Sequence, residues 1–159
     1  MNIDLLCMKI PKLVRIDLDK PITVLVKKSD HKTLGIWAGD CVERVLPYFE
    51  KKYPKDNRPR KAIEALRIWV KNGVFKMADI RRDALASHAA ARGVEDDSTA
   101  RSVARAAGQA LATAHVSTHS IAAAAYAATA VRDATGSVDE AMKERDWQYQ
   151  HLVELRESI

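Results

Sequence analysis

Three histidines in the second half of the chain are the side chains best suited to metal chemistry. His115 and His119 are four residues apart, a spacing that places both imidazoles on one face of an unbroken helix, as in metalloproteases. His88 or Asp40 could supply a third ligand. The glutamate of the metalloprotease motif is missing, and the intervening residues 116–118 predict a helix break. A metal site therefore stays open beside the favoured alternative, histidines that are hydrogen-bonded within the core or at a helix junction.

Nucleophilic chemistry has less support. Cys41 lies beside Asp40 in the middle of a predicted helix, whereas reactive thiols sit at helix N-termini or next to cations that lower their pKa. The chain also contains no glycine-rich phosphate loop, paired-cysteine motif or Gly-x-Ser-x-Gly elbow. The sequence thus predicts a protein that is not an enzyme and that needs no cofactor.

A basic surface is a third candidate, since the chain carries a formal net charge of +5. Six cations of the second and third predicted helices could contact phosphates: Arg58, Arg60, Lys61, Arg67, Arg81 and Arg82. Acidic residues are interspersed among them, which favours a solvated helical face. Nucleic-acid binding is kept as an alternative, but nucleic acid is disfavoured as the partner.

The elements that must position these side chains are mostly helices. Apolar residues recur at intervals of three and four over about six segments, near 30–53, 57–72, 76–92, 98–115, 118–135 and 138–156. Pro47 predicts a kink or an early stop in the first of them. Residues 84–130 include 19 alanines, and small side chains allow helices to approach closely. We expect an all-α, compact bundle with an alanine-rich core.

The N-terminal part reads differently. Residues 13–16 and 22–26 are rich in β-branched side chains and flank the turn signal Asp19-Lys20-Pro21, which predicts a short β-hairpin. We expect residues 1–29 to form this extension and residues 30–159 the helical domain, in one folding unit. The hairpin edge and the alanine-rich faces favour a homodimer on general grounds.

The composition also indicates the cellular compartment of the protein. Two cysteines are too few for a disulfide framework, the N-terminus lacks the pattern of a signal peptide, and no run approaches the roughly 20 apolar residues of a membrane span. We expect a cytoplasmic protein without membrane contact.

Several motifs resemble a bacterial family of Imm-five-like putative immunity proteins. They are LGIWAGDCVERVLP (34–47), DNRPRKAIEA (56–65), SHAAAR (87–92), RAAGQA (105–110), ATAHVSTH (112–119) and ERDWQ (144–148). The resemblance implies a helical, non-catalytic module that binds and neutralises a protein toxin. Pro59 matches the family pattern, and the resemblance points to six residues as the candidates for binding: Trp37, Asp40, Arg58, His88, His115 and His119. This chain has Gln109 where members often carry a histidine.

Charge adds a constraint on that partner. Inhibitors of nucleases are often acidic because they imitate the phosphate backbone, whereas this chain is basic. The resemblance combined with the charge therefore implies a toxin with an acidic face, or a contact dominated by apolar and aromatic side chains.

Overall fold

The computed structural model describes residues 17–158, and within this range every regular element is a helix. The eight helices are α2 (Asp19–Lys27), α3 (His31–Glu43), α4 (Leu46–Glu50), α5 (Arg58–Asn72), α6 (Met77–Gly93), α7 (Ser98–Ala112), α8 (His119–Thr135) and α9 (Val138–Glu157). None of these eight combines the length and apolar character needed to cross a membrane. The predicted all-α fold is confirmed for this part of the chain.

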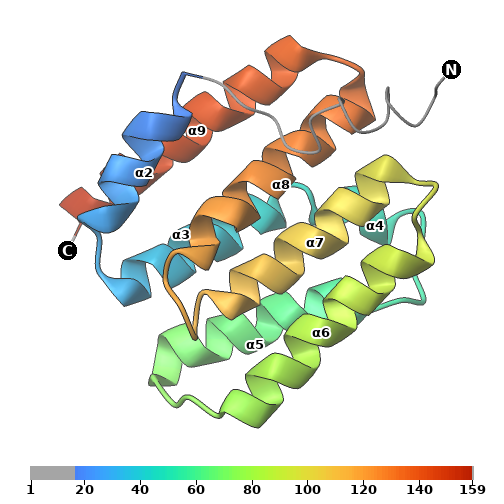
Figure 1. The fold of residues 1–159 in the computed structure, drawn as a ribbon, viewed down its shortest axis with the longest axis horizontal. Coiled ribbons are helices and arrows are strands. Elements are labelled where there is room, and N and C mark those ends of the chain that lie inside the picture. Colours follow the sequence, from blue (N-terminus) through green and yellow to red (C-terminus); the bar gives the residue numbers. More distant parts are fainter. Residues whose placement is uncertain (1–16, 159) are drawn as a thin grey trace, which may run out of the picture.

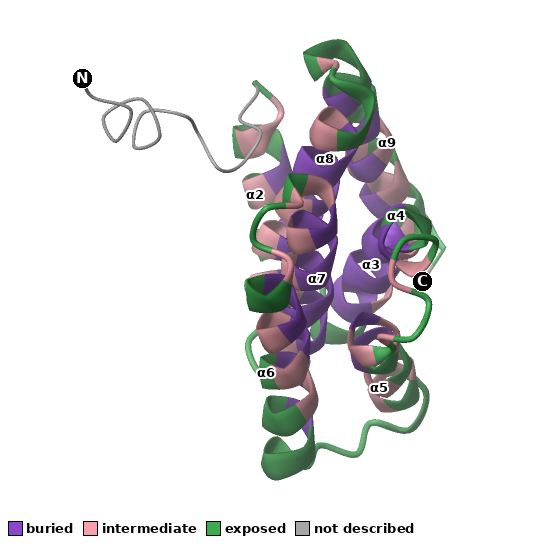
Figure 2. Ribbon diagram, turned by 90° about the vertical axis from the view of Figure 1, so that its right-hand side faces the viewer, coloured by how far each residue is buried: buried purple, intermediate pink, exposed green. Residues whose placement is uncertain are grey.

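The helices form two layers, seen edge-on in Figure 2. One layer contains α6, α7 and α8 side by side, and the other contains α5, α3 and α9, with α3 in the middle. Helix α7 packs against α6 and α8 within its layer and against α3, α4 and α5 across the interface. Buried residues concentrate where the layers meet (Figure 2).

Alanine accounts for most of the buried residues of the α6–α8 layer. Every one of Ala104, Ala107, Ala110, Ala123 and Ala127 is fully buried. Because a methyl group keeps the backbones near one another, α7 and α8 lie close together with no room for larger side chains. The opposite layer provides the bulk that fills the remaining volume, with Trp37, Phe49, Leu34, Leu46, Ile63 and Leu66 among its fully buried side chains.

Local interactions fix several helix ends. The side chain of Asp30 accepts a hydrogen bond from the Thr33 amide at 2.8 Å, and Asp97 and Ser137 cap α7 and α9 in the same way. Gly73 and Gly136 end α5 and α8 with φ angles of 70° and 67°, a left-handed conformation that costs other residues a steric penalty. The predicted break at residues 116–118 is confirmed, because α7 ends at Ala112 and α8 begins at His119.

The predicted hairpin is wrong where the structure can test it. Its second strand, residues 22–26, lies inside α2, while its first strand, residues 13–16, lies outside the described residues. Ile22 and Val26 are four residues apart, so one face of α2 buries both in the common core. Asp19, which the sequence predicts in a turn, pairs instead with the buried Arg145 of α9 at 2.6 Å. Tertiary burial outweighs the weak strand preference of this short run.

The helix count also differs from about six. Helix α2 is one addition, and Pro47 provides the other because it falls in the first turn of a separate helix, α4, after α3 has ended at Glu43. The predicted early stop at Pro47 is therefore confirmed. The homodimer stays a prediction, although its two grounds are weakened: residues 22–26 present no strand edge, and the alanine-rich faces pack within the fold.

The formal charges of α5 and α9 are opposite in sign. Helix α5 contains five basic residues and one acidic residue, whereas α9 contains six acidic and three basic residues. The two helices lie on opposite sides of α3, with α9 at the top of Figure 1 and α5 near the bottom.

The close approach of α7 and α8 can be tested by overpacking it. Ala127→Leu should destabilise the protein by about 2 kcal/mol, since the interface has no space for the added carbons. Ala134→Leu, on the exposed face of the same helix, is the matched control and should change stability by less than about 0.5 kcal/mol. Urea unfolding measures both values, and equal effects would contradict the packing described here.

Candidate functional site

The structure places Trp37 in the core. Its side chain is fully buried, and the indole Nε1 donates a hydrogen bond to the backbone carbonyl of Gln148 in α9 at 2.8 Å. The side chain of Gln148 donates in turn to the carbonyl of Ala124 in α8 at 2.9 Å. Trp37 therefore links α3 to α9 and, through Gln148, to α8, and it offers no surface to a partner.

Asp40 lies at the centre of a polar network that joins α3, α5 and α9. Its Oδ1 is 2.8 Å from Nη2 of Arg67, and its Oδ2 is 2.7 Å from Nε2 of His151. The His151 ring stacks on Trp147 at 4.6 Å between centroids, and the Arg44 guanidinium lies 3.9 Å above that indole. With both carboxylate oxygens occupied, Asp40 acts as a bridge between helices.

Most cations of the predicted basic surface are paired with carboxylates. Arg58 binds Asp56, Arg60 bridges Glu43 and Glu50, Arg67 binds Asp40, and Arg82 binds Asp79 and Asp83. The Arg58 hydrogen bonds lower the pKa of Asp56, and those of Arg60 lower the pKa of Glu50. Such pairing reduces the positive field that phosphate binding requires, so the geometry gives nucleic-acid binding little support.

Cys41 is enclosed by the core. It is fully buried, and burial raises the pKa of its thiol well above the ordinary value, with a further contribution from the carboxylates of Glu144 and Asp40. Because the thiolate is the nucleophile, this environment makes Cys41 inert.

The turn between α7 and α8 separates His115 from His119. His115 is exposed and stacks on Phe75, which precedes α6, with 5.7 Å between ring centroids. His119 begins α8, and its Nδ1 donates to Oε1 of Gln109 in α7 at 2.8 Å. The two imidazoles therefore contact different residues, and they do not share the helical face that a metal-binding pair would require.

His88 packs against α7 at Gly108. A Cβ atom at Gly108 would lie 2.7 Å from Nε2 of His88, so only glycine permits this approach. Burial lowers the pKa of His88 to about 4, and the nearby charges of Arg105, Arg92 and His119 add to the effect. Its Nδ1 is buried and has no hydrogen-bond partner among the described residues.

Next to His88 is a pocket of about 440 Å³ between α6, α7 and α8. Four α7 residues contribute to its lining, namely Arg101, Ser102, Arg105 and Gln109, together with His88 and with Tyr126 of α8. The sequence analysis identified only His88 here, and noted Gln109 as a departure from the family pattern.

The four predicted metal ligands do not assemble into one site in this structure. Asp40 is engaged with Arg67 and His151, whereas His119 is engaged with Gln109. Over residues 17–158, no group of three His, Cys, Asp or Glu side chains has an arrangement that could hold a metal ion. The geometry therefore does not bring His88, His115, His119 and Asp40 together as ligands.

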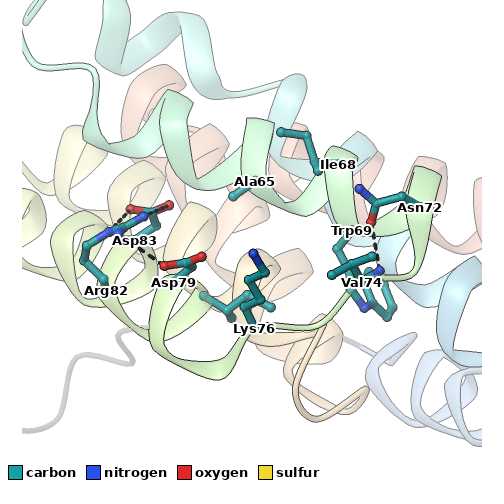
Figure 3. Close-up of a pocket in the computed structure, with 10 residues that line it drawn as sticks. Ala65, Ile68, Trp69, Asn72, Val74, Lys76, Asp79, Arg82 and Asp83 are labelled. Atoms are coloured by element: carbon teal, nitrogen blue, oxygen red, sulfur yellow. Dashed lines mark hydrogen bonds and ion pairs between the residues drawn. The ribbon is translucent and has the colours of Figure 1, made fainter.

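A groove between α5 and α6 was missed by the sequence analysis. It has a volume of about 320 Å³ and is lined by Ile68 and Trp69 of α5, by Val74 of the following turn and by Asp79 and Arg82 of α6 (Figure 3). Four large apolar side chains around this turn are exposed, and we call them the turn patch: Ile68 (60%), Val74 (54%), Phe75 (41%) and Met77 (41%). The signal was the group of apolar residues Val74, Phe75 and Met77 directly after Gly73, where a turn usually carries polar residues.

Comparison with known proteins identifies one family. The family model described as Imm-5 like putative immunity protein matches residues 24–155, which extend from the end of α2 almost to the end of α9. No curated protein and no solved structure matches the chain.

The burial of His88 predicts a specific loss of stability in acid. The unfolded chain protonates this imidazole near pH 6.5, whereas the folded chain does so only near pH 4. The contribution of His88 to the free energy of unfolding is therefore fully present above pH 6.5, and it is lost as the pH falls from about 6.5 to about 4. His88→Gln, which carries no such proton, should reduce this decrease by on the order of 1 kcal/mol after solvent screening.

Thermal or urea unfolding of both proteins across pH 4–7 measures the difference. The carboxylates titrate in both and therefore cancel in the comparison. Parallel stability curves would show that His88 is protonated as easily in the folded chain as in the unfolded one.

Proposed function

Because the chain belongs to the family of Imm-5 like putative immunity proteins, we propose that it neutralises a toxin by binding it directly and without catalysis. The family match over residues 24–155 is the observation that carries this proposal. The environments of Cys41 and Asp40 support it, since the buried thiol and the doubly paired carboxylate are poorly suited to attack or proton transfer.

The turn patch is the surface that we propose for this contact. Ile68, Val74, Phe75 and Met77 leave apolar area in water that the fold does not use, and exposed apolar clusters commonly mark protein interfaces. Phe75 provides an aromatic side chain of the kind that dominates binding energy. Next to the patch, Lys71 of α5 is exposed and forms no ion pair with another described residue, so the matching toxin surface would combine apolar contacts with an acidic residue.

The six predicted site residues are less suited to binding a partner or a metal than the turn patch is to binding a toxin. Trp37 is buried, Asp40 and Arg58 are paired, and His119 is bound to Gln109. Of these six, His115 is the one that approaches the turn patch, through its contact with Phe75. We therefore place His115 in the proposed interface, beneath the aromatic ring.

The decisive experiment tests the products of the genes that neighbour the gene for this chain as candidate toxins. Co-expression of the chain should restore growth to bacteria that produce the toxin, and the two purified proteins should form a complex. The double variant Val74→Ser/Phe75→Ser should weaken that complex at least tenfold, because it removes apolar contacts that are worth more than about 1.4 kcal/mol. Calorimetric titration measures the affinity.

A matched control exists at the other end of the molecule. Val138→Ser/Met142→Ser removes residues of similar exposure, 56% and 44%, from α9, and should leave the affinity unchanged. Absence of both rescue and complex would refute the proposed function. A complex that tolerates the Val74/Phe75 change would refute only the assignment of the surface.

A further inference from the structure

Arg105 differs from every other partly or fully buried arginine among the described residues. Arg58, Arg60, Arg67, Arg132 and Arg145 each pair with a carboxylate, while Arg101 and Arg156 donate to backbone carbonyls. The side chain of Arg105 makes no hydrogen bond or ion pair with any residue from 17 to 158. Arg105 is half-buried, yet none of its guanidinium nitrogens is cut off from water. This charged donor is therefore open to an anion that arrives from the solvent.

The surroundings of Arg105 fit an anion. Arg101 lines the same pocket, and Arg92 is close enough to contribute to the field that lowers the pKa of His88. The carboxylate of Glu95 also lines the pocket, but the two arginines outnumber it. Neither arginine forms an ion pair with Glu95, which leaves their charge available to a ligand.

Neutral donors complete the lining. His119 donates to Oε1 of Gln109, so the amide nitrogen of Gln109 stays free to donate into its surroundings. Ser102 and Tyr126 add two hydroxyl groups. A fork-shaped guanidinium with several neutral donors is the arrangement that binds planar or tetrahedral oxyanions.

We propose that the pocket between α6, α7 and α8 is a binding site for an oxyanion of the carboxylate or phosphate class, with Arg105 as its main charged donor. Gln109, Ser102 and Tyr126 supply neutral hydrogen bonds. The pocket volume of about 440 Å³ admits a small molecule or a single acidic side chain of a partner. This site is distinct from the turn patch and does not depend on the toxin proposal.

The test titrates the full chain with inorganic phosphate and, separately, with succinate, at a total ionic strength held constant with sodium chloride. Binding is followed by calorimetry and by the NMR signal of His88. We expect saturable binding of at least one anion. In the protein without anion, burial and the positive charges of Arg105, Arg92 and His119 lower the pKa of His88. A bound anion should raise this pKa, because its negative charge offsets the field of the two arginines.

Arg105→Gln should weaken this binding at least tenfold. Arg81→Gln is the matched control, since Arg81 is an exposed arginine of α6 and the same net charge is lost. The control should bind as the parent protein does. Arg105→Lys keeps the positive charge but lacks the planar guanidinium, so it should bind with intermediate affinity. This variant also shows whether a folding defect accounts for the loss of binding in Arg105→Gln.

The two titrations distinguish the source of the anion. Preference for phosphate would support the site and assign it to phosphorylated ligands, whereas preference for succinate would support it and assign it to carboxylates. Failure of both anions to bind would overturn the proposal, as would equal binding by Arg105→Gln and Arg81→Gln. A melting temperature of Arg105→Gln equal to or above that of the parent, without anion, would support it by showing that Arg105 adds nothing to folding.

Discussion

The close packing of α7 against its neighbours is the constraint on which the rest of the structure depends. This helix touches both neighbours in its own layer and also α3, α4 and α5, and it can do so because most of its buried positions are alanine or glycine. Ala104, Ala107 and Gly108 leave no bulk between backbones. The same feature shapes the candidate pocket, since His88 reaches its position by lying directly over Gly108.

Much of this arrangement could be predicted because its signals are local. The run of alanines, the left-handed position at Gly73, the stop at Pro47 and the break at 116–118 each act within a few residues. The segment 22–26 was misread because its β-branched composition and its spacing of buried residues point to different structures. Burial of Ile22 and Val26 on one helical face decided between them, and that depends on helices far along the chain.

The chemistry of the site was harder to predict, since it rests on pairs distant in sequence. Asp40 and His151 are 111 residues apart, and no spacing rule connects them. Arg105 looks like any other arginine in the sequence. Its distinction is the absence of a partner among the described residues, which becomes visible only when the neighbours of every arginine are known. The spacing of His115 and His119 correctly drew attention to these two residues. The turn before α8, however, places them against different neighbours, Phe75 and Gln109.

The opposite charges of α5 and α9 have a consequence for how a partner would arrive. Because α3 separates the basic helix from the acidic one, their formal charges contribute a dipole along the layer of α5, α3 and α9. The ion pairs of Arg58, Arg60 and Arg67 reduce this contribution. An acidic protein diffusing nearby experiences a torque that turns α5 toward it before any contact forms. The field thus restricts the orientations sampled in an encounter, and this orienting effect should be strongest within the Debye length of about 8 Å at physiological salt.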